Sequence, residues 1–182
     1  MLKPQDVYVL LKLALLGGRH MSYARLGADL FMPASEVHVS LTRCRESHLI
    51  NDGVSNESVN LSGLEEFLLH GIQYAFPITS GELTRGVPTS YAAPPLSSFI
   101  LPVNDPPPVW PSSEGTVRGY SVQPLYRKAP AAAFSDPAFY ESLALVDALR
   151  QGRARERNQA IQELQKRLFP HADAKSKSRP VA

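Results

Sequence analysis

Apolar residues near the N-terminus recur at the three- and four-residue spacing of a helix. The members of this pattern are Val7, Leu10, Leu11, Ala14 and Leu15. This spacing places them on one face of a helix. Pro4 suits the first helical position, because its φ is already helical and its missing amide would have no partner there. The glycines at 17 and 18 end the pattern, so the sequence predicts an amphipathic helix over residues 4–16.

A second helix is predicted over residues 23–31. Ser22 is its expected N-cap, since a serine hydroxyl can accept a hydrogen bond from an unpaired amide of the first turn. The apolar stripe of this helix consists of Tyr23, Leu26 and Leu30. Pro33 ends it, because a proline disfavours helical backbone at the preceding residue and cannot donate a hydrogen bond. A three-residue turn, Met32-Pro33-Ala34, is expected next.

A third helix is predicted from Ser35, as its N-cap, through His48. Its inward-facing positions are Val37, Leu41 and Cys44, and Leu49 and Ile50 continue this apolar face. A turn at residues 51–53 and a short polar wing at 54–61 follow. The wing contains Glu57 but no lysine or arginine. Ser62 is the expected cap of a fourth helix over 63–71, whose stripe is Leu64, Phe67, Leu68 and Ile72.

This order of helix, helix, turn, helix, wing and helix resembles the winged helix-turn-helix of bacterial transcription regulators, in the general pattern of the MarR-like families. The resemblance covers about residues 4–76 and is carried by the segments 22–30, 32–34 and 35–50 and by the polar wing. It implies a winged helix-turn-helix domain over residues 1–76. The helix over 35–48 would then enter the major groove of double-stranded DNA.

The resemblance also identifies candidate DNA-binding residues. If Val37, Leu41 and Cys44 face the core, the other side of the helix offers its remaining polar and apolar side chains to base edges and phosphates. The start of the preceding helix offers free amides and polar groups to phosphate. The candidates are Ser22, Tyr23, Arg25, Ser35, Glu36, His38, Val39, Thr42, Arg43 and Arg45. The alternative interpretation is a solvated helix face with ordinary charges.

Charge is unevenly distributed along the 182 residues. The net charge is 0 over residues 1–62, −4 over 63–149 and +6 over 150–182. A neutral DNA-binding head makes few phosphate contacts, and affinity falls with fewer neutralised phosphates. Two heads on a two-fold site double those contacts, so we expect a homodimer.

Prolines are concentrated in the middle of the chain, where twelve of the 16 lie between residues 77 and 137. From residue 77 to 111 neither a helical nor a strand period is present, and apolar side chains such as Tyr91, Phe99 and Trp110 are interleaved with prolines. We therefore predict an extended Pro-rich arm over 77–134 that contains one short strand within 115–123. The arm would pack on its own domain, on a dimer mate or on another protein.

Two C-terminal helices complete the prediction. Ser135 or Asp136 would cap a helix beginning at Pro137 and ending at Gly152, and a basic helix with Ala160, Leu164 and Leu168 on its apolar side follows. Together they predict a helical hairpin over 135–170, followed by a disordered basic tail over 171–182. The expected fold class is mainly α. The basic side of the hairpin is a solvated face, a phosphate contact or a docking surface.

The remaining chemistry is sparse. The single cysteine, Cys44, falls at a core position of the third helix and is expected to behave as a small buried hydrophobe. We find no nucleophile motif, paired acid and base, metal-ligand spacing or phosphate loop, so neither an enzyme nor a cofactor is expected. The apolar run at 7–16 is too short to span a bilayer, and the expected location is cytoplasmic, associated with the nucleoid.

Two functional hypotheses follow. The first is a sequence-specific transcription regulator that binds an operator as a dimer through the helix over 35–48. The second is an antitoxin-like interaction module. Its Pro-rich arm and C-terminal hairpin would bind a partner enzyme, while its winged domain regulates its own operon.

Overall fold

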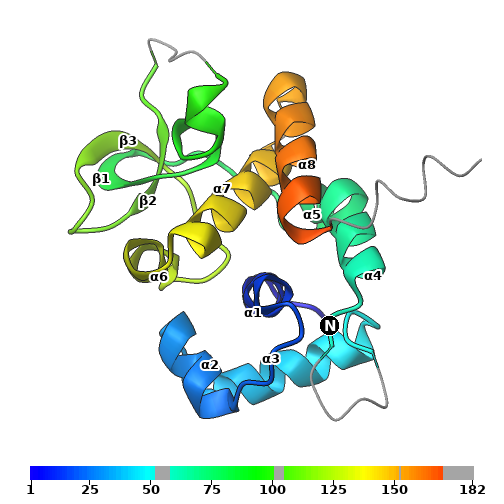
Figure 1. The fold of residues 1–182 in the computed structure, drawn as a ribbon. Helices are drawn as coiled ribbons and strands as arrows, with labels where there is room; N and C mark the ends of the chain where they lie inside the picture. Colours follow the sequence, from blue (N-terminus) through cyan, green and yellow to red (C-terminus); the bar gives the residue numbers. More distant parts are fainter. Residues whose placement is uncertain (52–57, 101–104, 152, 170–182) are drawn as a thin grey trace, which may run out of the picture.

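The computed structural model describes residues 1–51, 58–100, 105–151 and 153–169. It is mainly helical with a small three-stranded sheet, as Figure 1 shows. In chain order the elements are α1 (Pro4–Leu16), α2 (Tyr23–Leu30), α3 (Ala34–Glu46), α4 (Leu61–Glu66), the π-helical turn η1 (Phe67–Gly71), α5 (Ile72–Ala75), β1 (Leu83–Pro88), the 3-10 turns η2 (Ser90–Ala92) and η3 (Leu96–Ser98), β2 (Pro108–Pro111), β3 (Val117–Ser121), α6 (Ala129–Ser135), α7 (Pro137–Gln151) and α8 (Ala154–Leu168). The predicted mainly α class is confirmed.

α1 lies at the centre of the molecule, with α2 and α3 on one side and α7 and α8 on the other (Figure 1). Its residues from Asp6 to Leu13 are all buried. The Tyr8 ring packs against Tyr126 and Phe139 at centroid distances of 5.2 and 4.9 Å. The hydrophobic core around α1 therefore contains residues from the predicted head, Pro-rich arm and helical hairpin, up to Phe169.

A salt bridge joins α1 to the start of α7. The Lys12 ammonium lies 2.6 Å from a carboxylate oxygen of Asp136. Burial pushes the pKa of Asp136 upward, but the hydrogen bonds from Lys12 and from backbone amides outweigh it and hold this pKa below its usual value. Asp136 also accepts a hydrogen bond of 3.0 Å from the Phe139 amide. It is therefore the N-terminal cap of α7, one of the two caps that the sequence predicted.

The helical prediction is confirmed in outline, with two wrong caps. α1 ends at Gly17, which adopts a left-handed conformation, and Ser22 caps α2 by accepting from the Arg25 amide at 3.2 Å. α3, however, begins at Ala34, because the Pro33 carbonyl already accepts the first helical hydrogen bond, from Val37. Ser35 thus lies inside the first turn. Similarly, Asn60 rather than Ser62 caps α4.

The helix after the predicted wing is longer than expected. We predicted an end at Gly71, but the chain continues through the π-helical turn η1 into α5 and stops at Ala75. Ile72 is fully buried. The extra turn brings this residue into the core, and the burial of its side chain offsets the unfavourable helix propensity of the glycine before it.

The prediction of an extended Pro-rich arm over 77–134 is wrong, because this segment contains the sheet. β1 pairs antiparallel with both β2 and β3, and β2 runs parallel to β3. β3 lies within the predicted strand at 115–123. The neighbouring backbone lies very close to Gly86 and to Gly119. An added Cβ at Gly86 would lie 2.1 Å from the Trp110 carbonyl oxygen, and one at Gly119 would lie 2.0 Å from the Pro107 carbonyl oxygen. Glycines and prolines that usually interrupt strands are therefore part of this sheet, which explains the missing sequence signal.

The Pro-rich segment packs on its own chain through a buried aspartate of α7. Asp147 is 1% exposed and accepts hydrogen bonds from the Thr89 hydroxyl at 2.8 Å and the Trp110 indole at 2.7 Å. Its other oxygen pairs with Arg150 at 2.7 Å, and Arg150 also donates to the Phe76 carbonyl. Of the three arrangements considered for this segment, the structure shows packing on its own domain.

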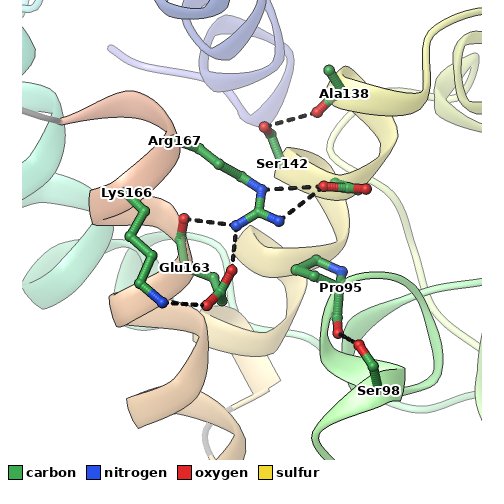
Figure 2. Close-up of polar contacts among 8 residues, drawn as sticks. Pro95, Ser98, Ala138, Ser142, Glu163, Lys166 and Arg167 are labelled. Atoms are coloured by element: carbon green, nitrogen blue, oxygen red, sulfur yellow. Dashed lines mark hydrogen bonds and ion pairs between the residues drawn. The ribbon is translucent and has the colours of Figure 1, made fainter.

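The predicted helical hairpin is confirmed by the contact between α7 and α8. The basic side chains at the end of α8 pair with acidic ones: Arg167 pairs with Glu141 of α7 at 3.1 Å and with Glu163, and Lys166 pairs with Glu163 at 2.8 Å. Figure 2 shows Lys166 and Arg167 on either side of Glu163. These two cations are therefore engaged within the hairpin. α6 was not predicted, and the predicted basic tail lies outside the described residues.

Gly27 gives a stability prediction in which two physical effects have opposite signs. Helix propensity alone would make Gly27→Ala stabilising by about 1 kcal/mol. In the structure an added Cβ would lie 2.5 Å from the Met32 carbonyl oxygen, a backbone atom of the turn. We therefore expect Gly27→Ala to destabilise the protein by about 1 to 3 kcal/mol, as measured by urea unfolding. A gain in stability would show that the turn between α2 and α3 yields easily.

Candidate nucleic-acid interface

α2 and α3 form a helix pair joined by residues 31–33. Phe31 ends α2 in the left-handed conformation with a φ of 53°, and the Met32 amide donates to the Gly27 carbonyl at 2.8 Å. The Met32 side chain is 4% exposed and belongs to the core. The turn is therefore held by a backbone hydrogen bond and by an apolar anchor, which fixes the direction in which α3 leaves it.

α3 buries one face and exposes the other. The inward-facing residues predicted from the sequence, Val37, Leu41 and Cys44, are all fully buried. The Cys44 sulfur lies 3.9 Å from the Asp6 carbonyl oxygen, and its burial agrees with the predicted role as a small hydrophobe. The exposed candidates on α3 are Ser35, His38, Val39 and Thr42.

One of the α2 candidates, Tyr23, lies beside α3. The rings of Tyr23 and His38 are 5.5 Å apart, so the start of α2 borders the exposed face of α3. Arg25 is exposed but pairs with Asp29 at 3.3 Å. Ser22 is also exposed, although its hydroxyl is occupied by the cap. This border brings the amino end of α2 next to His38.

The sequence predicted Arg43 on the DNA-facing side of α3, but its guanidinium lies against Asp6 of α1. Its guanidinium makes two hydrogen bonds to the carboxylate of Asp6, with a distance of 2.8 Å for the Nε bond, and it also donates to Ser40 at 3.2 Å. Asp6 is fully buried and the Arg43 side chain is 14% exposed. The hydrogen bond to Asp6 raises the pKa of Arg43. The Arg43 guanidinium thus joins α3 to α1, and contact with a base would require it to leave this pair.

Glu36 connects α3 to a distant part of the chain. Its carboxylate accepts a hydrogen bond of 3.3 Å from the Tyr126 hydroxyl. Burial raises the pKa of Tyr126, the neighbouring Arg127 opposes this effect, and Glu36 adds to it. Both Glu36 and Arg45 are partly buried. The amino-terminal part of α3 is therefore held against the segment that precedes α6.

Two surface grooves meet α3 at Glu36 and share Lys3, Gln5 and Glu36. One has a volume of 590 Å³ and extends to Tyr126, Arg127 and Arg150. The other, of 380 Å³, extends along α3 past Ser35, Val39 and Arg43. Sequence reasoning restricted to residues 4–76 missed Lys3 and Arg127, because no local pattern places either of them next to α3.

The segment predicted as a wing follows α3 directly. Ile50 and Val59 form an antiparallel bridge, in which the Asn51 amide donates to Ser58 at 2.8 Å and the Asn60 amide donates to Leu49 at 2.9 Å. The tip predicted between them, with Glu57, lies outside the described residues. The bridge pins the two ends of this loop against the carboxyl end of α3.

Neither a metal cluster nor a membrane span is found in the described part of the chain. Among these residues, His, Cys, Asp and Glu side chains do not gather into any group of three or more that could hold a metal ion. The described helices are also too short or too polar to cross a membrane.

Comparison with protein-family models, with curated proteins and with solved structures found no match for this chain. Functional inference therefore depends on the residues and their geometry.

The Asp6–Arg43 pair predicts a strong energetic coupling. Removing one partner of a buried ion pair leaves an uncompensated charge, which costs about 3 to 5 kcal/mol. We expect Arg43→Ala to destabilise the protein by about 3 kcal/mol, and the double variant with Asp6→Ala to lose clearly less than the sum of the single changes. Urea unfolding of the four proteins measures this coupling.

Arg25→Ala is the matched control for this cycle, because its ion pair with Asp29 lies at the surface. We expect it to change stability by less than about 1 kcal/mol. Additive losses from the two single changes at positions 6 and 43 would mean that the pair contributes nothing as a unit.

Proposed function

We propose that this protein is a sequence-specific DNA-binding transcription regulator whose head is a winged helix-turn-helix and whose α3 enters the major groove. The observation that supports it most is the division of α3: Val37, Leu41 and Cys44 are fully buried, while Ser35, His38, Val39 and Thr42 are exposed. α2 borders this face through the contact of Tyr23 with His38. In this proposal the bridged loop after α3 is the base of the wing.

The exposed side chains of α3 have groups suited to base edges. The His38 imidazole can donate or accept a hydrogen bond, and Val39 presents an apolar surface to a thymine methyl. The Thr42 hydroxyl already donates to the His38 carbonyl at 3.0 Å, which leaves its methyl group and lone pairs for DNA. Arg43 enters this proposal as a positioning residue, because its guanidinium is held by Asp6.

The proposed functional unit is a homodimer on a two-fold DNA site. The exposed strip of α3 consists of Ser35, His38, Val39 and Thr42, so it contains neither a lysine nor an arginine. A single head would thus neutralise few phosphates and bind weakly at cellular salt. Two heads spaced by one turn of DNA would double the contacts and confer selectivity for a palindromic site.

DNA binding is tested by fluorescence anisotropy with duplexes from upstream of the protein's own coding region and a duplex of mixed sequence. We expect selective binding to an upstream duplex, weakened about tenfold by His38→Ala and by Thr42→Ala, since base contacts contribute about 1 to 3 kcal/mol each. Gln162→Ala, at an exposed position of α8, is the control and should have no effect. Sequence-blind binding that is unchanged in both α3 variants would refute the assignment of α3.

A second candidate function is the antitoxin-like interaction module, and the sheet offers one observation in its favour. Leu83 and Tyr120 are cross-strand partners of β1 and β3, and they are 45% and 41% exposed. An exposed apolar pair on a sheet is a common feature of protein-binding surfaces. Because Lys166 and Arg167 are paired within the hairpin, the sheet is the better candidate surface for a partner enzyme.

This second function predicts a separation of effects between the two surfaces. Replacing both Leu83 and Tyr120 by serine should abolish co-purification of a partner enzyme from the native cell and leave DNA binding unchanged. His38→Ala should have the opposite pattern. Quantitative mass spectrometry of the purified complexes measures the first effect. If the serine variant retains the same partner in the same amount, the sheet is not its docking surface.

A further inference from the structure

The strongest unexplained feature of the α3 surface is its lack of positive charge between residues 35 and 42, and this inference rests on the proposed DNA-binding function. Between residues 35 and 42 the exposed side chains are neutral apart from His38. Arg43 is neutralised by Asp6, and Arg25 on the α2 side by Asp29. Phosphate contacts usually supply most of the affinity for DNA. The amino-terminal part of a DNA-binding α3 therefore needs cations from another part of the chain.

Helix geometry identifies two opposite flanks of α3. Positions 36 and 38 are two residues apart, so their side chains point about 200° apart around the helix axis. His38 contacts Tyr23 at the start of α2, whereas Glu36 contacts Tyr126 in the segment before α6. The exposed strip with Ser35, Val39 and Thr42 lies between these flanks. One flank thus belongs to α2, and the other to a segment far away in sequence.

Lys3 and Arg127 supply positive charge on the second flank. Both side chains are exposed, and both line the 590 Å³ groove together with Glu36. The groove also reaches Arg150, but that residue is 7% exposed and its charge is paired with Asp147. Arg43 lines the second groove, but its positive charge is likewise paired, with the carboxylate of Asp6. Two exposed cations therefore face one carboxylate, Glu36, which already accepts a hydrogen bond from Tyr126.

We propose that Lys3 and Arg127 contact the DNA backbone on the flank of α3 opposite α2. The major groove is about 12 Å wide and has a phosphate strand on each side, so a helix within it requires contacts on both flanks. The start of α2 provides one set, and Lys3 and Arg127 provide the other. The phosphate-binding surface of the proposed head thus includes a residue about fifty positions beyond residue 76.

The test measures how DNA affinity depends on salt. Each phosphate neutralised contributes about −0.9 to the slope of log K against log salt concentration. We expect Arg127→Gln and Lys3→Gln each to reduce the magnitude of this slope by about 1 per protomer, on an upstream duplex and on one of mixed sequence alike. Because the loss is sequence-independent, the ratio of the two affinities should remain unchanged. Arg127→Lys should retain the slope.

Arg155→Gln is the matched control, since Arg155 is an exposed arginine of α8 and its loss changes the net charge by the same amount. Equal slopes for Arg127→Gln and Arg155→Gln would overturn the proposal, because the effect would then reflect bulk charge. If the wild type binds and His38→Ala weakens binding while Arg127→Gln has no effect, this inference alone fails. If the wild type binds neither duplex, the proposed function fails and this inference falls with it.

Discussion

The burial of α1 is the constraint on which the rest of the structure depends. A helix buried from Asp6 to Leu13 contains two charged residues, and each requires a partner inside the protein. Asp6 is paired with Arg43 of α3, and Lys12 is paired with Asp136 at the start of α7. These two pairs point to opposite sides of α1. They therefore set the position of the DNA-binding candidate α3 relative to the C-terminal helices.

The local parts of the fold were predictable because their signals are local. Pro4, Gly17 and Ser22 act within one turn of their own helix, and the burial of Val37, Leu41 and Cys44 follows from helical spacing. The caps predicted at Ser35 and Ser62 each lie two residues after the observed caps, since the cap depends on which neighbouring carbonyl or side chain accepts first. Which of these acceptors caps the helix depends on the local backbone geometry, and the types of residues present do not determine that geometry.

The long-range parts were not predictable from the same patterns. β1 and β2 are short, contain proline and depend on Gly86 for close approach, so they lack the alternation that marks a strand. The role of Arg43 depends on Asp6, 37 positions away, and a sequence pattern shows only that an arginine follows Thr42. For the same reason, Arg127 could be associated with α3 only through the contact between Tyr126 and Glu36.

The shared core also determines which experiments can separate the two proposed functions. Truncation after residue 76 is the obvious way to isolate the proposed DNA-binding head, but it would remove the Tyr126 and Phe139 rings that cover Tyr8 and the Asp136 carboxylate that neutralises Lys12. A buried tyrosine and a buried ammonium would then meet solvent or remain unpaired, and both changes destabilise the fold. Loss of DNA binding in such a fragment would therefore measure unfolding. Substitutions of exposed side chains leave this core intact, so they can assign DNA contact and partner contact to separate faces of the molecule.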